Sequence, residues 1–223
     1  MFRLKIILIA VGGVLAFLGF EEFQVSQKTS DTASDVELLA IEKSQELENN
    51  YIRVGKHWAI YPGSIYEYQA DKNETGEPSN SAKVNYTYYP IISNDHPYNV
   101  AIDGLIAKYG DPSLIPEGEY PTFGQFFVLV KSKKFKTIGA IPDIWGDEES
   151  VQGLVVNRIN ELDNEELGLL KQSFPLVDMN KVLILEEGRE PSSAGKSIGM
   201  MAGGVVLALF GLFLMIPRGN GGA

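Results

Sequence analysis

The sequence predicts an α+β fold in which two terminal transmembrane helices flank one mixed or mainly antiparallel sheet domain with a few helices. Three observations predict it. An apolar stretch lies near each end of the 223-residue chain, the segment between them has an ordinary globular composition, and that segment alternates short β-rich runs with a few helical patterns. The middle segment is long enough to bury a core of its own.

The apolar stretch 197–217 lies between Lys196 and Arg218 and contains no charged residue. A helix of this length, rising about 1.5 Å per residue, crosses the roughly 30 Å hydrocarbon layer of a membrane. The alternative is a helix buried in a soluble domain, but a small domain cannot easily cover a helix that is apolar all round. We therefore expect a transmembrane helix.

The N-terminal stretch Ile6–Phe20 follows Arg3 and Lys5 and fits either a short membrane anchor or the hydrophobic region of a signal peptide. Bulky and acidic residues, Glu21-Glu22-Phe23, stand where a signal peptidase needs small ones. The sequence therefore favours an uncleaved membrane anchor that spans residues 6–23.

The charges around the first helix predict its orientation, because basic residues precede it and acidic residues follow it. The N-terminus is then cytoplasmic, and the second crossing returns the chain to the cytoplasm. A central domain exported without cysteine suits the periplasm and a bacterial inner membrane. The predicted order is a cytoplasmic N-terminus (1–5), the first transmembrane helix (6–23), a polar tether (24–34), the extracytoplasmic α+β domain (35–190), a juxtamembrane linker (191–196), the second transmembrane helix (197–217) and a cytoplasmic tail (218–223).

The composition excludes several classes of function. The net charge of −10 at pH 7 repels nucleic acid and anionic headgroups. The absence of cysteine excludes disulfides, thiol nucleophiles and thiolate zinc sites, and two histidines are too few for an imidazole-rich metal site. We expect no cofactor, no metal and no nucleic-acid partner; the expected partners are the lipid bilayer and a membrane protein.

Turn residues and apolar periodicity divide the central segment into elements. A polar turn at 71–81 separates two strands that are expected to form a hairpin. The sequence does not decide whether 99–109 is a helix or a strand. Its apolar residues partly fit a helix that Gly110 would end, but Gly104 interrupts that pattern. Helices are expected from Ser34 or Asp35 to about Asn49 and from Asp163 to Gln172, and strands at 57–61, 64–69, 83–92, 123–130, 151–159 and 179–186.

Catalytic and ligand motifs are weak. The segment Glu190–Ser197 ends in the Gly-Lys-Ser of a phosphate-binding loop, but Glu190 replaces its first glycine and its charge would repel phosphate. The acidic run Asp147-Glu148-Glu149 lacks the spacing of a calcium loop and is better explained as a solvated loop.

The two histidines leave one catalytic alternative open. His57 or His96, with a nearby acid such as Asp95 or Asp103, would supply an acid–base pair near neutral pH. No hydrolase motif specifies such a pair, and each histidine is more simply a packed or surface residue.

The tyrosines are the most distinctive feature of the domain. Tyr66 and Tyr68 share one face of a predicted strand, and Tyr86 and Tyr88 share a face of the next. If the strands pair with these rows facing, the rings form an aromatic ladder. A buried ladder is core packing, whereas an exposed ladder is a surface for a protein partner or a sugar ring.

Small residues recur in both apolar stretches. Gly195, Gly199 and Gly203 repeat every four residues, and the first stretch offers a matching Gly12 and Ala16. Such spacing lets two helix backbones approach closely in lipid. Glycine is also simply common in membrane helices, and an external helix is a further alternative to packing within the chain.

Together these features predict a membrane-anchored, extracytoplasmic interaction or assembly module without catalytic activity. Its plan of two terminal membrane helices around an exported sheet domain resembles that of cytochrome oxidase assembly factors, in architecture only. The alternatives are a periplasmic hydrolase with an unrecognised histidine and carboxylate site, and a glycan-binding module that uses exposed tyrosines.

Overall fold

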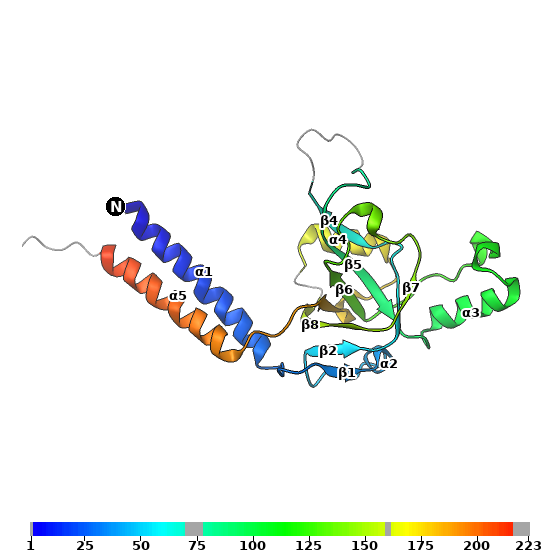
Figure 1. Cartoon of the computed structure of the whole chain (residues 1–223), viewed down its shortest axis with the longest axis horizontal. Helices are drawn as coiled ribbons and strands as arrows, with labels where there is room; N and C mark the ends of the chain where they lie inside the picture. Colours follow the sequence, from blue (N-terminus) through cyan, green and yellow to red (C-terminus); the bar gives the residue numbers. More distant parts are fainter. Residues whose placement is uncertain (1, 70–77, 159–161, 216–223) are drawn as a thin grey trace, which may run out of the picture. The chain divides into compact units, whose positions relative to one another are not determined.

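The computed structural model describes residues 2–69, 78–158 and 162–215 (Figure 1). The chain divides into two compact units. The first, which we call the helix pair, contains α1 (Phe2–Ser26) and α5 (Ala194–Met215). The second, which we call the sheet domain, is Thr32–Glu190.

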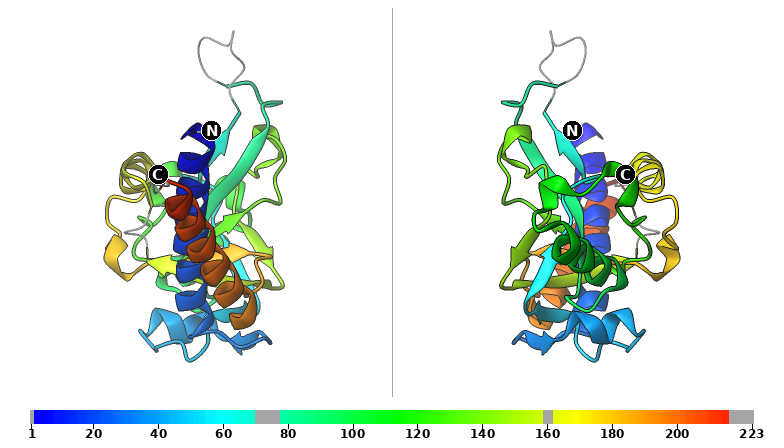
Figure 2. Two further views of the ribbon diagram at one scale, coloured as in Figure 1. Left: turned by 90° about the vertical axis from the view of Figure 1, so that its left-hand side faces the viewer. Right: turned by 90° about the vertical axis from the view of Figure 1, so that its right-hand side faces the viewer.

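The two helices of the pair lie side by side and antiparallel, as Figures 1 and 2 show. Their backbones touch at glycines. A Cβ atom built on Gly12 would lie 2.6 Å from the carbonyl oxygen of Gly204, and one built on Gly204 would lie 2.4 Å from the backbone nitrogen of Ala16. Only residues without bulky side chains permit this approach, which maximises dispersion contacts between helices.

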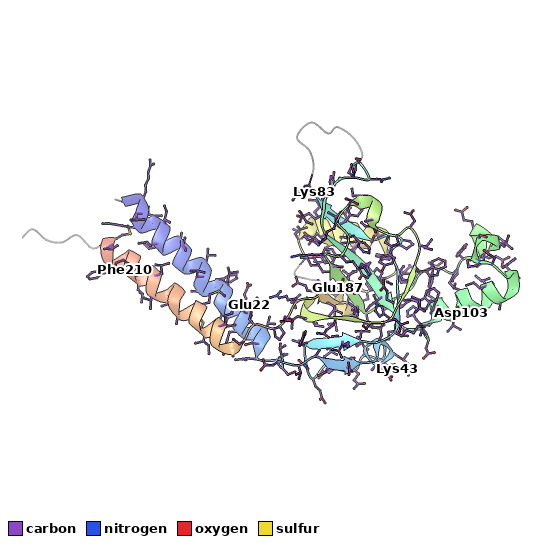
Figure 3. All side chains as sticks on the ribbon, in the orientation of Figure 1. Glu22, Lys43, Lys83, Asp103, Glu187 and Phe210 are labelled. Atoms are coloured by element: carbon purple, nitrogen blue, oxygen red, sulfur yellow. The ribbon has the colours of Figure 1, made fainter. Side chains whose placement is uncertain are left out.

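The outer surface of the helix pair is apolar and exposed. Side chains such as Phe210 point away from the contact between the helices (Figure 3) and are more than half exposed. Both helices are long and apolar enough to cross a membrane, and only 11% of each apolar window is buried. α1 is longer than the expected 6–23, because Glu21, Glu22 and Gln24 are good helix formers. The expected tether from 24 is therefore helical as far as Ser26.

The sheet domain is α+β, with a mixed, curled sheet (Figure 1). The strand order is β1-β2-β8-β9-β6-β5-β3-β7, with β4 paired to β5. The pairs β1–β2 and β6–β9 are parallel and the others antiparallel. The strands are β1 (Ser34–Val36), β2 (Tyr51–Val54), β3 (His57–Ala59), β4 (Ile65–Tyr68), β5 (Val84–Ile92), β6 (Val128–Ser132), β7 (Gly146–Glu148), β8 (Val151–Arg158) and β9 (Leu183–Glu187).

Three α-helices and several single turns connect the strands in the described part of the domain. The α-helices are α2 (Leu38–Glu42), α3 (Pro97–Tyr109) and α4 (Asn164–Ser173). The 3₁₀ turns are η1 (Pro112–Leu114), η2 (Glu117–Glu119), η3 (Ile138–Ala140) and η5 (Met179–Lys181).

Each face of the sheet carries its own apolar core. The first core covers one face together with α2 and includes Ile52, Ile91 and Leu185. The second core includes Tyr88, Phe126 and the α4 residue Leu170. Successive residues of a strand point to opposite faces, so β5 supplies Tyr88 to one core and Tyr89 to the other.

Several sequence expectations are corrected in the structure. The helix expected from Ser34 or Asp35 to about Asn49 is wrong. Ser34–Val36 is strand β1, because it pairs with β2. Helix α2 ends at Glu42, shortly before Ser44, which has a φ of 65°. The segment 99–109, undecided from the sequence, belongs to helix α3, which ends at Gly110 with a φ of 82°. Most of the expected strand 123–130 precedes β6 and is irregular. The turn expected at 71–81 lies largely outside the described residues.

Candidate functional site

A pocket of about 220 Å³ lies between the β4–β5 hairpin and the N-terminal half of α4. We call it the tyrosine pocket, because all four tyrosines singled out in the sequence line it. The other lining residues are apolar or acidic. The full lining is Ile65, Tyr66, Glu67, Tyr68, Tyr86, Tyr88, Asp163, Glu165, Glu166 and Leu169.

The hairpin register determines which tyrosines face each other. The two strands pair, but Tyr88 lies opposite Ile65 and Tyr86 lies opposite Glu67. Residues directly opposite in an antiparallel pair share a face, so Tyr66, opposite Thr87, lies on the other face of the hairpin from Tyr86 and Tyr88. The register shifts after Glu67, where Tyr68 lies opposite Val84. The two rows therefore do not face each other as a ladder.

The four tyrosines differ in burial. Tyr88 is 2% exposed and belongs to the second core, whereas Tyr86 is half-buried at its edge. Tyr66 and Tyr68 are half-buried and contact each other edge to face, with ring centroids 6.3 Å apart. Tyr88 is thus a packing residue, and Tyr86 is the ring that combines partial exposure with a position beside the pocket acids.

Tyr86 is the centre of the polar contacts in the pocket. Its hydroxyl lies within hydrogen-bond distance of a Glu67 carboxylate oxygen and 2.9 Å from Oε1 of Glu166. Burial and these two carboxylates raise the pKa of the Tyr86 phenol. The hydrogen bond from Tyr86, with another from Asn85, lowers the pKa of Glu67. Glu67 is therefore ionised at neutral pH.

A helix cap and a tyrosine of β5 hold Glu166 at this position. Asp163 caps α4, since its Oδ1 accepts a 2.8 Å hydrogen bond from the backbone nitrogen of Glu166. Glu166 also interacts with the Tyr88 hydroxyl and contributes, after burial, to the raised pKa of that phenol. Sequence reasoning located the cap at Asp163 but missed Glu67 and Glu166, because no spacing pattern links β4 with α4.

One cation lies on the aromatic part of the site. The ammonium nitrogen of Lys131 is 4.1 Å from the ring centroid of Tyr86 and 5.3 Å from that of Tyr88. This geometry is a cation–π interaction. The nearest carboxylate in an ion pair with Lys131 is Glu186, at 3.9 Å.

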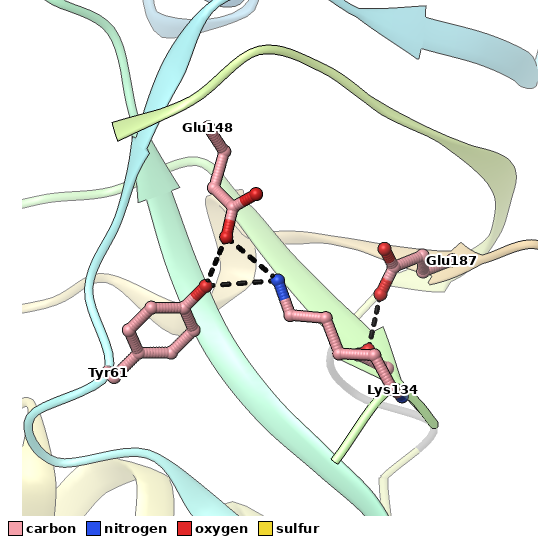
Figure 4. Close-up of polar contacts among 5 residues, drawn as sticks. Tyr61, Lys134, Glu148 and Glu187 are labelled. Carbon is pink, nitrogen blue, oxygen red and sulfur yellow. Dashed lines mark hydrogen bonds and ion pairs between the residues drawn. The ribbon is translucent and has the colours of Figure 1, made fainter. Parts of the chain in front are cut away.

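A second tyrosine–glutamate cluster lies elsewhere in the sheet domain (Figure 4). The Tyr61 hydroxyl donates a 2.7 Å hydrogen bond to Oε1 of Glu148. The Lys134 ammonium donates 3.0 Å hydrogen bonds to both groups. Nearby, the Ser132 hydroxyl donates to Glu187. The hydrogen bond from Tyr61 lowers the pKa of Glu148, and burial raises that of Tyr61.

The two clusters differ in charge balance. In the second, the ammonium of Lys134 contacts the carboxylate of Glu148 directly, so the cluster is neutralised internally. In the tyrosine pocket, none of the acids forms an ion pair with another described residue. Lys131 acts on Glu67 through space without forming an ion pair with it, so the described residues leave an excess of negative charge in the pocket beside an aromatic ring.

The histidines of the hydrolase alternative are committed to backbone contacts. His57 is 1% exposed, and its Nδ1 donates a 2.7 Å hydrogen bond to the carbonyl oxygen of Gly55. In His96, Nδ1 accepts from the backbone nitrogen of Tyr98, so Nε2 carries the proton and donates to Gln125 at 2.8 Å. Within the described residues, neither ring forms a hydrogen bond with a carboxylate.

A larger cavity of about 550 Å³ is lined by residues that include Asp95 and His96. His96 is part of the cavity wall, and the backbone hydrogen bonds of its two ring nitrogens hold the ring in place there. The acidic run of the sequence is also partnered: Asp147 pairs with Lys56 at 3.0 Å. Among the described residues, no group of three acids or histidines is placed to hold a metal ion.

The small residues singled out in the apolar stretches divide into two groups. Gly12 and Ala16 lie at the contact between α1 and α5. A Cβ atom at Gly195, Gly199 or Gly203 would meet nothing within 4 Å, so the structure does not bring these three glycines to the contact. The contact with α1 is made instead by a neighbouring stripe of small residues on α5, which faces α1 and consists of Gly204, Ala208 and Gly211.

Comparison with protein families, with curated proteins and with solved structures finds no match for this chain.

Proposed function

We propose that this protein is a membrane-anchored interaction or assembly module whose extracytoplasmic sheet domain binds a partner protein through the tyrosine pocket, without catalysing a reaction. The partner is a membrane protein or is held at the membrane. The bacterial inner membrane, with both termini cytoplasmic and the sheet domain periplasmic, is the proposed location.

The helix pair supports the anchoring part of the proposal. Its outer side chains are apolar and exposed, which is costly in water and favourable in lipid. In lipid no hydrophobic force acts between helices, and the close backbone contact at Gly12 and Gly204 supplies dispersion contacts that favour their association. Arg3 and Lys5 lie in the first turn of α1, at the N-terminal end of its apolar stretch, and favour a cytoplasmic N-terminus.

The observation that carries the binding part is the tyrosine pocket itself. It combines concavity, a partly exposed aromatic ring and several carboxylates, which are the features of a recognition site. The histidines support the non-catalytic part, because the hydrogen bonds of Nδ1 in His57 and of both ring nitrogens in His96 are to backbone groups.

Copurification in mild detergent tests the proposal with matched variants. Leu169 lines the pocket and is 44% exposed, whereas Leu176 is 65% exposed and does not line it. We expect a stoichiometric partner with the wild-type chain and with Leu176→Arg, and loss of that partner with Leu169→Arg, which fills the pocket. Equal recovery with both variants, or no stoichiometric partner for the wild-type chain, contradicts the proposal.

A further inference from the structure

We infer that the tyrosine pocket receives the cationic side chain, guanidinium or ammonium, of an arginine or lysine in a basic segment of the partner protein. This inference rests on the proposed function and specifies its chemistry. It follows from the charge, the aromatic surface, the hydrogen-bond balance and the size of the pocket.

The charge of the pocket selects a cation. Four carboxylates line it, and none is paired with a basic residue in the described part of the chain. Asp163 is occupied as the cap of α4, which leaves Glu67, Glu165 and Glu166 to meet a ligand. The chain as a whole carries a net charge of −10, so a basic partner is also attracted at long range.

The aromatic wall already accommodates a cation. The Lys131 ammonium, only 4.1 Å from the centroid of Tyr86, lies within cation–π range of the same ring that contacts Glu67 and Glu166. This contact shows that the ring of Tyr86 interacts with a positive group, and because Lys131 occupies the face that it contacts, a ligand cation would share the ring with Lys131 or displace it. It is an observation independent of the carboxylates, and it favours a cation over a neutral ligand.

The hydrogen bonds around Tyr86 leave acceptors in excess. A phenol has one proton, yet two carboxylates approach the Tyr86 oxygen. Each carboxylate can accept several hydrogen bonds, and the phenols and the Asn85 amide supply few donors. A guanidinium has five N–H donors and an ammonium three, so either supplies both the missing donors and the missing charge.

The volume restricts the ligand to a single side chain. Pockets for drug-sized molecules occupy roughly 300–1,000 Å³. At about 220 Å³ the tyrosine pocket is smaller than this range. A side-chain head with part of its apolar stem, which would pack on Ile65 and Leu169, is a suitable occupant.

Ligand-observed saturation-transfer NMR tests this inference with the full chain in nanodiscs of zwitterionic lipid. The probes are the capped peptide Gly-Ser-Arg-Ser-Gly, its lysine version, and a version with citrulline, which has the shape of arginine without its charge. Maltotriose serves as a neutral sugar probe. The variants are Glu67→Gln and Glu166→Gln, with Glu117→Gln on η2 as a matched control outside the pocket.

We expect saturation transfer to the arginine and lysine peptides and a roughly tenfold weaker affinity for citrulline, which corresponds to one lost charge-assisted hydrogen bond. Glu67→Gln and Glu166→Gln should each weaken arginine binding by a similar factor, and Glu117→Gln should not. Equal binding of arginine and citrulline, no transfer to the arginine peptide, preferential binding of maltotriose, or equal effects of all three variants would overturn the inference.

The copurification experiment separates this inference from the proposed function. If Leu169→Arg loses the partner but citrulline binds as well as arginine, the interaction module stands and the cation chemistry is wrong. If arginine is preferred but Leu169→Arg retains the partner, the cation chemistry stands and the proposed docking surface is wrong.

Discussion

Glu67 on β4 and Glu166 on α4 converge on one atom, the phenol oxygen of Tyr86. Elsewhere in the same domain, the Tyr61 phenol is shared by one carboxylate and one ammonium, those of Glu148 and Lys134. The second arrangement is electrostatically complete. The first has two negative groups, and no cation of the described residues forms an ion pair with either of them. That difference is the basis for assigning binding to one cluster and a structural role to the other.

This difference predicts stability effects of different size for the same substitution at the two tyrosines. Tyr61→Phe leaves Lys134 and Glu148 without their shared hydroxyl in a site that is 4% exposed at Tyr61, and we expect a loss of about 1–2 kcal/mol. Tyr86→Phe releases two partly solvated carboxylates that repel each other, so we expect a change within about 0.5 kcal/mol. Denaturant unfolding of the full chain, followed by near-ultraviolet circular dichroism, measures both. A larger loss for Tyr86→Phe would show that its cluster is the structural one.

Acidification should destabilise the sheet domain in two steps. Burial lowers the pKa of His57 from its ordinary value of 6.5, so the unfolded state binds the proton more readily as the pH falls below 6.5. The hydrogen bond from Tyr61 lowers the pKa of Glu148 from 4.5, so a second loss follows below pH 4.5. In both cases the stabilisation is complete above the unfolded-state pKa and is lost as the pH approaches the folded-state value.

His57→Asn isolates the first step, since the asparagine amide can keep the hydrogen bond to Gly55 without titrating. We expect a flat midpoint of thermal unfolding between about pH 7 and pH 5 in this variant and a sloping one in the wild-type chain. The two profiles should have the same slope only if His57 is not protonated on unfolding in this range.

The arrangement of the helix pair predicts which cysteine pairs form disulfides in the cysteine-free chain. A Cβ atom at Gly19 would lie 3.0 Å from that of Met201 and 2.5 Å from the Met201 backbone nitrogen, so the helices must separate slightly to accept a cysteine at Gly19. That separation brings the pair into the disulfide range of about 3.5–4.5 Å between Cβ atoms, so Gly19→Cys with Met201→Cys should crosslink on mild oxidation. Gly12→Cys with Gly203→Cys should not, because Gly203 faces away from α1. The mobility of the monomer on non-reducing gels shows whether the disulfide within the chain has formed. Crosslinking of the second pair but not the first would mean that a different face of α5 contacts α1.

Bulky residues at the glycines test the same contact. Gly204→Leu would drive a side chain into the backbone of Ala16, whereas Gly199→Leu meets open space. Both variants keep the helix apolar. We expect Gly204→Leu to abolish the Gly19–Met201 crosslink and Gly199→Leu to leave it intact. Loss of the crosslink in both would show that leucine disturbs the helix itself rather than the contact.

Lys131 should compete with a bound cation for the face of Tyr86. Lys131→Gln removes the internal ammonium 4.1 Å from the ring while keeping much of the side-chain length. We expect the arginine peptide to bind roughly two- to fivefold more tightly to this variant, because one weak cation–π interaction is worth about 0.5–1 kcal/mol. Peptide titration in nanodiscs measures the change. Weaker binding would show that Lys131 supports the site instead of competing for it.

The local parts of the fold could be predicted from the sequence. Asp163 as a helix cap and the β4–β5 hairpin both depend on residues close in the chain. The sequence does not decide between helix and strand for the segment 99–109, which the structure places in α3. The strand β1 could not be predicted, because Ser34–Val36 is extended only through pairing with β2. Local capping signals there indicate a helix, and tertiary pairing overrides them.

The candidate site was predictable only in its tyrosines. Tyr61 and Glu148 are 87 residues apart, and Tyr86 and Glu166 are 80 residues apart, so no spacing rule joins them. The offset of the tyrosine rows was also hidden, because a shift of one residue in strand register exchanges the faces. The stripe of α5 that faces α1 likewise depends on the rotation of the helix, which small-residue spacing leaves open.

Site-specific photocrosslinking in native membranes tests whether the tyrosine pocket contacts a basic segment of a partner protein. A photoreactive benzoyl-phenylalanine replaces Leu169 in the tyrosine pocket or, as a control, Leu176 outside it. The account predicts one adduct of defined mass at position 169, mapped by mass spectrometry to a basic segment of a partner protein and lost in the Glu67→Gln, Glu166→Gln background. The same adducts at both positions, or none at position 169, would contradict the account.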